Sequence, residues 1–225
     1  MSLVSVIIPT LNEADGIERT LTRLSRIGGL ELIVSDGGSS DETVSLAERH
    51  ARVITAATGR AAQMNAGARA ASGEILLFLH ADSFLSEACV AELRKTLEDP
   101  RVIGGAFRLR IESSRIGVRL VGLAANIRTQ LTGIPYGDQG LFVRTRVFNE
   151  MGGFPELPLM EDLEFSRRLK HYGRRVILRT PIGTSSRRWD REGVWWVTLR
   201  NQMMVLLYFL GVPPGRLAGW YRPVR

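Results

Sequence analysis

A histidine and an aspartate end an apolar run in the first half of the chain. Residues 75–79 are five apolar residues in a row, and His80, Ala81 and Asp82 follow directly. Such a run is typical of a strand buried on both faces of a sheet, and ligands dock at the carboxyl ends of strands in open α/β sheets. A carboxylate there suits Mg²⁺ or Mn²⁺ carrying a phosphate, because hard cations take oxygen ligands. In the ordinary alternative, Asp82 caps a helix that begins near Ser86.

Two more polar clusters follow predicted strands. An apolar strand at residues 4–8 leads into residues 9–13, which read Pro-Thr-Leu-Asn-Glu, and a second strand at 30–34 leads into residues 35–41, which read Ser-Asp-Gly-Gly-Ser-Ser-Asp. The two glycines allow the backbone to approach a ligand closely. The acidic and amide side chains also suit the starts of the helices that follow, so each cluster has a purely structural alternative.

The first hundred residues alternate between strands and helices. A short strand at 53–54 precedes a helix of small residues that carries Asn65, which is either a surface residue or a partner for the edge of a base or sugar. The alternation predicts an α/β fold with a doubly wound, mostly parallel sheet and helices on both faces, which brings the three polar clusters to one edge. The glycine motifs of Rossmann dehydrogenases and P-loop enzymes are missing, so a diphosphate would need another neutraliser, such as a metal on Asp82.

The second half carries two further acidic motifs. Residues 102–111 and 141–143 are predicted strands, separated by a helix at 115–131 and a glycine-rich loop with Asp138 and Gln139. Glu161 and Asp162 then open a helix, on which Asp162 shares one face with Phe165, Leu169 and Tyr172. A carboxylate aimed inward along that face could deprotonate a sugar hydroxyl. The alternative is an acidic residue that satisfies the helix dipole.

We expect one domain over residues 1–190, with a nucleotide-binding half (1–100) and an acceptor-binding half (101–190), and a helical extension at 191–225. The apolar run after Gln202 is about eight residues, too short to span a bilayer. This segment is expected to pack on the core or on a second subunit as a homodimer. A peripheral contact with the inner face of the membrane, helped by Arg200, Arg216 and Arg222, is the alternative.

The net charge and the cysteine count limit which binding partners and which cellular compartment we expect. The net charge is +7 and the pI is near 10.4, but the arginines are spread along the chain, so a nucleotide or an anionic membrane is a better partner than nucleic acid. The single cysteine, Cys89, excludes a disulfide framework and fits a reducing compartment. A strand close to the amino terminus disfavours a signal peptide, so we expect a cytoplasmic protein.

Taken together, these stretches resemble family 2 glycosyltransferases with the GT-A fold, across roughly the first 190 residues. The matching stretches are VIIPTLNE (6–13), IVSDGGSSDET (33–43), NAG (65–67) with GE (73–74), HAD (80–82) and ED (161–162). The chain resembles in particular the small His-Ala-Asp subgroup that is associated with arsenosugar biosynthesis.

The resemblance implies an inverting transfer of a sugar from a nucleotide-diphosphate donor, UDP or GDP, to a hydroxyl acceptor. It implies that Asp162 is the general base and that Asp82 coordinates a divalent cation, Mg²⁺ or Mn²⁺, which bridges the diphosphate. The donor and acceptor would be bound by a set of residues drawn from all the motifs: Pro9, Thr10, Asn12, Glu13, Asp36, Gly37, Ser39, Arg60, Asn65, His80, Ala81, Asp82, Asp138, Gln139, Glu161, Arg188 and Trp189.

The chain departs from the family pattern at two places. His80 replaces the first acid of the usual Asp-x-Asp, which removes one negative charge that attracts the metal, although a neutral imidazole can still ligate a metal or bind ribose. Residues 185–189 resemble a Gln-x-x-Arg-Trp element without its glutamine; there Arg188 would clamp a phosphate and Trp189 would stack on a sugar, unless the segment is a solvated basic turn. The lost acid keeps open a second hypothesis, a nucleotide-sugar-binding module without catalysis.

Overall fold

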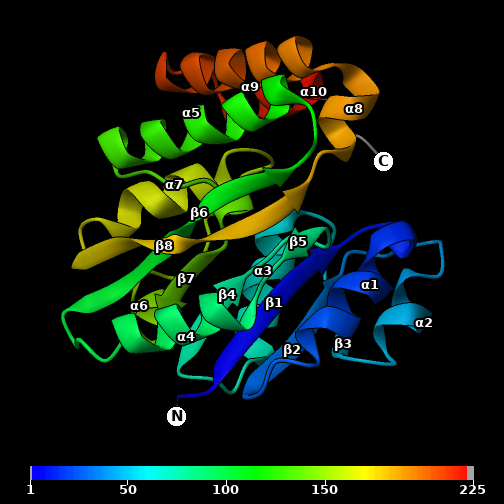
Figure 1. Cartoon of the computed structure of the whole chain (residues 1–225), viewed down its shortest axis with the longest axis vertical. Helices are drawn as coiled ribbons and strands as arrows, with labels where there is room; N and C mark the ends of the chain where they lie inside the picture. The colour runs from blue at the N-terminus through cyan, green and yellow to red at the C-terminus, as the bar shows by residue number, and fades with distance from the viewer. Residues whose placement is uncertain (1, 222–225) are drawn as a thin grey trace.

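The computed structural model describes residues 2–221, with the side chain of Arg188 excepted. An eight-stranded sheet in the order β3-β2-β1-β4-β7-β6-β8-β5 runs through the molecule, with helices on both faces (Figure 1). The strands are β1 (Val4–Thr10), β2 (Leu30–Asp36), β3 (Arg52–Thr55), β4 (Ile75–Phe78), β5 (Ser83–Phe84), β6 (Val102–Glu112), β7 (Leu141–Arg144) and β8 (Arg174–Ser185). The helices are α1 (Ala14–Leu24), α2 (Thr43–Ala47), α3 (Arg60–Ala70), α4 (Glu87–Thr96), α5 (Ile116–Thr132), the 3₁₀ turn η1 (Gly137–Gln139), α6 (Thr145–Glu150), α7 (Glu161–Leu169), α8 (Arg187–Glu192), α9 (Val194–Phe209) and α10 (Pro214–Trp220).

The sheet is mixed and mostly parallel, as the sequence predicts. β1 pairs in parallel with β2 and β4, and β2 with β3, so the expected order of the first hundred residues is confirmed. β7 is antiparallel to both β4 and β6. The long strand β8, which the sequence analysis did not assign, pairs in parallel with β6 and interrupts its register at two irregular positions. Arginines, a proline and those irregularities break the alternation that would have revealed β8 in the sequence.

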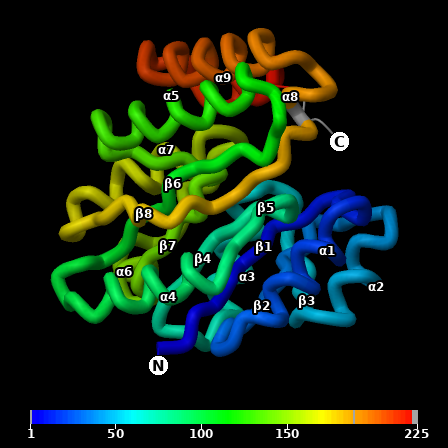
Figure 2. Tube along the Cα trace, in the orientation of Figure 1, coloured from blue at the N-terminus to red at the C-terminus, as the bar shows by residue number. Residues whose placement is uncertain are grey.

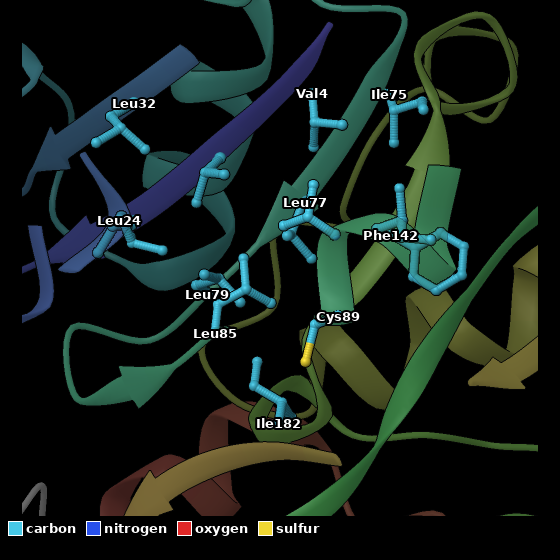
Figure 3. Packing of buried hydrophobic residues seen from close by; sticks show 14 of the residues in the cluster. Val4, Leu24, Leu32, Ile75, Leu77, Leu79, Leu85, Cys89, Phe142 and Ile182 are labelled. Atoms are coloured by element: carbon cyan, nitrogen blue, oxygen red, sulfur yellow. The ribbon is translucent and has the colours of Figure 1, made fainter. Parts of the chain in front are cut away.

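Side chains of the central strands alternate between two cores. On one face of β1, Val4, Val6 and Ile8 pack with residues of α1 and α4; Figure 3 shows Val4, Leu77, Cys89 and Phe142 in this cluster. On the other face, Ile7 packs with residues of α3, α6 and α7. A strand flanked by two cores favours apolar residues on both sides, which explains the consecutive apolar residues 6–8 of β1 and 75–78 of β4.

The carboxyl-terminal helices join the domain through two smaller apolar clusters. One cluster places Val194, at the start of α9, against residues of β6 and α5; in the other, Met204 of α9 and Leu217 of α10 pack with Met160 and Leu163 around the start of α7. Helices α5 and α9 run beside each other at one end of the molecule (Figure 2). Within residues 2–221, no helix combines the length and the apolar character needed to cross a membrane.

The expectation for Tyr172 is wrong, and the one for Arg222 falls outside the described residues. Tyr172, which was expected to share the inward face of α7, follows the end of that helix and is 45% exposed. The helix ends at Leu169, three residues too early for Tyr172 to join the buried stripe. Arg222 lies outside the described residues.

Candidate active site

A polar cleft opens at the carboxyl ends of β1 and β4. It encloses about 410 Å³, and a smaller cavity of about 160 Å³ adjoins it and shares Arg60, His80, Asp138 and Asn201. Ten of the residues predicted from the sequence line the larger cleft: Pro9, Thr10, Asn12, Glu13, Arg60, His80, Ala81, Asp82, Asp138 and Trp189. Glu161 and Asp162 line the smaller one. The two halves of the chain therefore meet at one site.

The loops after β1 and β2 are bound to each other. Asn12 adopts a left-handed backbone conformation (φ 55°), and its N–H donates to Ser39 Oγ at 2.8 Å. Its own Oδ1 accepts from the N–H of Ser40 at 2.9 Å. Asparagine tolerates the left-handed region better than most residues, so the residue type fits the turn. These bonds fix the floor of the cleft beside β1.

Asp36 is 3% exposed, and its carboxylate turns into its own loop. It accepts hydrogen bonds from the N–H groups of Gly38 (2.9 Å) and Ser39 (2.7 Å), and from the hydroxyl of Thr10 at 3.0 Å. Burial alone would raise the pKa of Asp36, but the hydrogen bonds from Ser39, Gly38 and Thr10 hold it below its ordinary value. Asp36, Gly37 and Ser39 do not line the cleft, so their predicted contact with a nucleoside stays a prediction.

A chain of charged and polar groups crosses the boundary between the two cavities. Arg60 Nε lies 3.2 Å from Glu161 Oε1, and Arg60 Nη2 lies 2.7 Å from His80 Nε2. Burial raises the pKa of Glu161, the guanidinium of Arg60 lowers it, and Asp162 raises it further, with a net increase. Glu161 is 4% exposed, and Arg60 supplies its counter-charge.

Asp162, at the start of α7, faces the loop that holds η1. Its Oδ2 accepts from the N–H of Gly137 at 2.6 Å, and its Oδ1 accepts from the N–H of Leu163 at 2.7 Å. A Cβ atom on Gly137 would lie 2.9 Å from Asp162 Oδ2, 2.9 Å from Arg60 Nη2 and 3.3 Å from His80 Nε2. The acid of α7 and the histidine that follows β4 therefore converge on one point, and glycine leaves that point open.

Three polar atoms without a hydrogen-bond partner lie along this cleft. They are Asp138 Oδ1, Trp189 Nε1 and Asn201 Oδ1, all of them buried. Burial is also the main cause that raises the pKa of Asp138 to about 6; Arg128 lowers it and Asp162 raises it. Buried polar atoms normally have partners, so these three atoms mark a place where a polar ligand can bind.

Glu13 and Arg187 join the loop after β1 to α8. Arg187 Nη2 lies 3.1 Å from Glu13 Oε2, and both residues line the cleft. Burial raises the pKa of Glu13, the hydrogen bond and charge of Arg187 lower it, and the charge of Asp82 raises it. The carboxylate of Asp82 is thus close enough to Glu13 to affect its pKa. The two acids make this side of the cleft acidic.

A preformed metal site is not seen within residues 2–221, where no three His, Cys, Asp or Glu side chains form a group able to hold a metal ion. Mg²⁺ is commonly held by one or two carboxylates while substrate phosphates and waters complete its coordination. Asp82, with His80 two residues before it, fits that pattern and does not fit a site built from the protein alone.

Asn65 and Gln139 both bind other parts of the chain. Asn65 Nδ2 donates to the carbonyl of Phe154 at 2.9 Å, and its Oδ1 accepts from the N–H of Phe154 at 2.8 Å. Gln139 is fully buried, accepts from Thr129 Oγ1 at 2.8 Å and donates to the carbonyl of Phe107 at 3.2 Å. Neither residue lines either cavity. Both fix loops that border the site, and their predicted contact with a ligand stays a prediction.

Several lining residues were missed by the sequence analysis. Gln63 donates to the carbonyls of Thr10 (2.6 Å) and Ser35 (3.0 Å), and Arg187 and Asn201 reach the cleft from α8 and α9. Gln63 lies two residues before the predicted Asn65 without a motif to mark it, and Asn201 is one of two adjacent amides in the mostly apolar helix α9. Arg187 belongs to the segment 185–189, for which only Arg188 and Trp189 were predicted to bind a ligand. The side chain of Arg188 lies outside the described residues.

The fold and the cleft define the class of protein. A mixed α/β sheet that brings acidic residues from the end of β4 and from α7 to one cleft is the architecture of GT-A glycosyltransferases, and solved structures of that class match it. The chain belongs to glycosyl transferase family 2, whose family model matches residues 5–151.

Curated relatives match part of the chain. A PGL/p-HBAD biosynthesis glycosyltransferase of Mycobacterium bovis (strain BCG / Pasteur 1173P2) is 40% identical in an alignment of 96 residues that covers 38% of this chain and 38% of that protein. The chain therefore aligns with well under half the length of this relative.

Solved structures share the fold over almost the whole chain. The mannosyltransferase PcManGT from Pyrobaculum calidifontis, in complex with GDP-Man and Mn²⁺, has a TM-score of 0.66 at 20% identity, covering 97% of this chain and 68% of that one. Glucosyl-3-phosphoglycerate synthase from Mycobacterium tuberculosis, in complex with Mn²⁺, UDP and glucosyl-3-phosphoglycerate, has a TM-score of 0.62 at 22% identity, covering 94% and 81%.

Proposed function

We propose that this chain transfers a sugar, with inversion, from a UDP- or GDP-linked donor to a hydroxyl acceptor. The observation that carries the proposal is the convergence of Asp162, Arg60 and His80 on the open space beside Gly137. That convergence supports a single reaction site between the nucleotide half and the acceptor half. The solved relatives that bind GDP-Man or UDP with Mn²⁺ support the choice of donors.

The nucleotide half would hold the donor between the loop after β1 and α3. Thr10, Asn12 and Glu13 line this side, and Gln63 holds the backbone of Thr10 in place. Arg60 and Arg187 are the described cations of the cleft. Guanidinium groups pair well with phosphate oxygens, so these two arginines would orient the diphosphate.

The general base is assigned to Asp162. The acceptor oxygen bonds to the anomeric carbon from the side opposite the diphosphate, while the bond between that carbon and the diphosphate oxygen breaks. The leaving diphosphate keeps the electron pair, and the hydroxyl proton passes to Asp162. The N–H groups of Gly137 and Leu163 hold the carboxylate in a fixed orientation for this transfer.

A divalent cation is part of the proposal. Asp82 would hold Mg²⁺ or Mn²⁺ together with oxygens of the substrate, and His80 is a neutral nitrogen ligand or a partner of the ribose. When bound, the cation would neutralise charge that develops on the diphosphate.

Asp138 is a second acid in the same cleft. Because burial raises its pKa to about 6, it would change its charge near neutral pH, a property that general bases share. Alternatively, Asp138 Oδ1 and Asn201 Oδ1, which have no hydrogen-bond partner, would accept hydrogen bonds from hydroxyl groups of the acceptor or the sugar. The structure favours Asp162 as base because its orientation is fixed by two backbone bonds.

Paired variants test the assignment. Asp162→Asn should keep UDP or GDP binding, measured by calorimetry with Mn²⁺, and lower transfer or donor hydrolysis by ~10²- to 10⁴-fold. Asp138→Asn should lower it less and raise the acceptor KM. The assignment of the base fails if the Asp162 variant turns over near normally while the Asp138 variant does not. Binding of nucleotide sugars by the wild type without any turnover across a donor panel would support the non-catalytic module instead.

The finer predictions remain open to separate tests. The resemblance to the His-Ala-Asp subgroup rests on the tripeptide at 80–82, so its link to arsenosugars stays a prediction, as do the cytoplasmic location and a homodimer. We also propose that residues 1–190 form one catalytic domain and that residues 191–225 are its extension. In support, α8 and α9 each contribute lining residues to the cleft of that domain.

A further inference from the structure

Large apolar side chains are exposed mainly on one part of the molecule. Apart from Leu3 and Tyr172, every exposed large apolar residue of the described chain lies on α5, on α9, at the residue after α9, or on α10. We call this set the α5/α9 face: Ile116, Leu120, Leu123, Ile127, Leu131, Trp195, Trp196, Leu199, Met203, Leu206, Phe209, Leu210 and Trp220. The exposed fractions reach 82% at Leu131 and 78% at Trp195. A soluble surface rarely leaves so many large apolar groups together without a partner.

The exposed residues recur at helical spacing. On α5 they lie at 116, 120, 123, 127 and 131, and on α9 with its cap residue the series 195, 199, 203, 206 and 210 follows the same pattern. Steps of three and four place each series along one side of its helix. The opposite sides contact the domain, because Val118 of α5 and Val194, Val197 and Met204 of α9 are buried. Each helix is therefore amphipathic, with an outer side that residues 2–221 leave exposed.

The charges near this face are positive. Helices α5, α9 and α10 contain no Asp or Glu, and the sequence from Gly193 to its end has none either. Arg119 and Arg216 are exposed on α5 and α10. Acids that contact these helices or the residues beside them are already paired: Asp190 with Arg115 at 3.3 Å, Glu192 with Arg200, and Glu164, which accepts from Tyr208, with Arg167 and Arg168. An apolar face with a positive border matches the surface of an anionic bilayer.

Tryptophan usage points to the same partner. Three of the four tryptophans of the chain, Trp195, Trp196 and Trp220, belong to the face and are between 58% and 78% exposed. Tryptophan is favoured at the level of lipid headgroups because its ring is apolar and its N–H is polar. A second copy of the chain fits less well, since a symmetric contact would bring the same arginines, with no acids, toward one another.

We propose that the α5/α9 face binds the surface of an anionic lipid bilayer, with both helices lying in the plane of the interface. At 17 and 16 residues, α5 and α9 are too short to cross the hydrocarbon layer at the 1.5 Å rise of a helix. This inference does not depend on the proposed function, because it uses the outer side of α9, whereas Asn201 on another side lines the cleft.

Sedimentation with vesicles tests the proposal on the full chain. Sucrose-loaded vesicles of phosphatidylcholine and phosphatidylglycerol in equal amounts should carry the protein into the pellet, and pure phosphatidylcholine should carry much less. Raising the salt should weaken binding, because charges at the surface are screened. Tryptophan emission should shift to shorter wavelengths on binding, as Trp195 and Trp196 leave water.

Matched variants separate the lipid from other partners. Leu199→Ser with Leu206→Ser should weaken vesicle partitioning by about tenfold or more, because two apolar side chains no longer enter the bilayer. Arg119→Glu with Arg216→Glu should also weaken it. Tyr172→Ser, an exposed apolar residue outside the face, should leave it unchanged. Thermal unfolding would verify that all variants are folded. The proposal is overturned if the wild type stays in solution with anionic vesicles, or if sedimentation equilibrium shows a dimer that the leucine variants dissociate and vesicles do not bind.

Discussion

Arg60 Nη2 lies 2.7 Å from His80 Nε2, at the boundary between the two cavities of the cleft. A guanidinium is always protonated and can only donate, so Nε2 of the imidazole accepts the bond and the proton of a neutral His80 sits on Nδ1. The same guanidinium pairs with Glu161. One arginine from α3 therefore links the end of β4 to the start of α7.

Loss of Arg60 should destabilise the fold. Arg60→Met leaves Glu161 buried without its counter-charge, and we expect the free energy of unfolding to fall by about 1 to 3 kcal/mol at pH 7.5 in urea titrations. The double variant with Glu161→Gln should recover most of that loss. Arg49→Met is the matched control, because its pair with Glu18 is exposed (61% and 47%) and should contribute about 1 kcal/mol or less. Equal losses in the two single variants would contradict this account.

A methyl group on Gly137 should impair transfer more than stability. The φ of Gly137 is not in the left-handed region, so alanine is allowed by the backbone, but its Cβ would lie 2.9 Å from Asp162 Oδ2. Displacing the base should lower the rate by about 10²-fold, while the melting temperature changes by a few degrees at most. Gly28→Ala is the control, since no atom lies within 4 Å of its Cβ position. Wild-type activity in Gly137→Ala would show that the convergence at this point is not required.

Ionisation of Asp138 should destabilise the folded protein, whereas ionisation of an acid in an ion pair stabilises it. Its pKa of about 6 lies above the ordinary 3.8, so its charge destabilises the folded state fully above pH 6, and this effect disappears as the pH falls toward 3.8. Asp138→Asn should therefore stabilise the protein by about 1 to 3 kcal/mol at pH 7.5 and by progressively less toward pH 4 in urea titrations.

Asp99 provides the control of opposite sign. Hydrogen bonds and charge from Arg101 are the main cause that lowers its pKa to about 2, so its contribution is present above pH 3.8 and is lost as the pH falls toward 2. Asp99→Asn should lower stability at pH 7.5. If both asparagine variants changed stability in the same direction at that pH, the environment assigned to Asp138 would be wrong.

Asn65→Asp should damage the fold without changing nucleotide affinity. The substitution keeps the size of the side chain, but it replaces the N–H₂ that donates to the carbonyl of Phe154 by an oxygen. We expect a loss of about 1 to 3 kcal/mol and a dissociation constant for UDP or GDP with Mn²⁺ that stays within about twofold by calorimetry. Gln202→Glu, on the exposed side of α9, should change neither. A large loss of nucleotide affinity at unchanged stability would instead support the contact with a base or sugar predicted from the sequence.

The sequence determined the parallel half of the sheet and the loops at its edge. Residues 6–8, 32–34 and 75–79 are apolar at consecutive positions because both faces of these strands are buried, and that signal is local. Pro9 to Glu13 and His80 to Asp82 follow strands directly, so a parallel sheet sends them to one edge. For the same reason, seven of the ten predicted residues that line the larger cleft come from these two loops.

Tertiary structure decided the contacts between distant residues. Asn65 pairs with the backbone of Phe154, 89 positions away, and Arg187 pairs with Glu13 across 174 positions, and neither contact leaves a periodic trace in the sequence. The helix pattern of α7 placed Asp162 on an inward side, but only the packing of η1 against that helix gave it the N–H of Gly137. Local spacing fixes which side of a helix or strand a residue occupies. The partner that it meets there depends on how the elements pack, because side chains from separate segments fill the same volume.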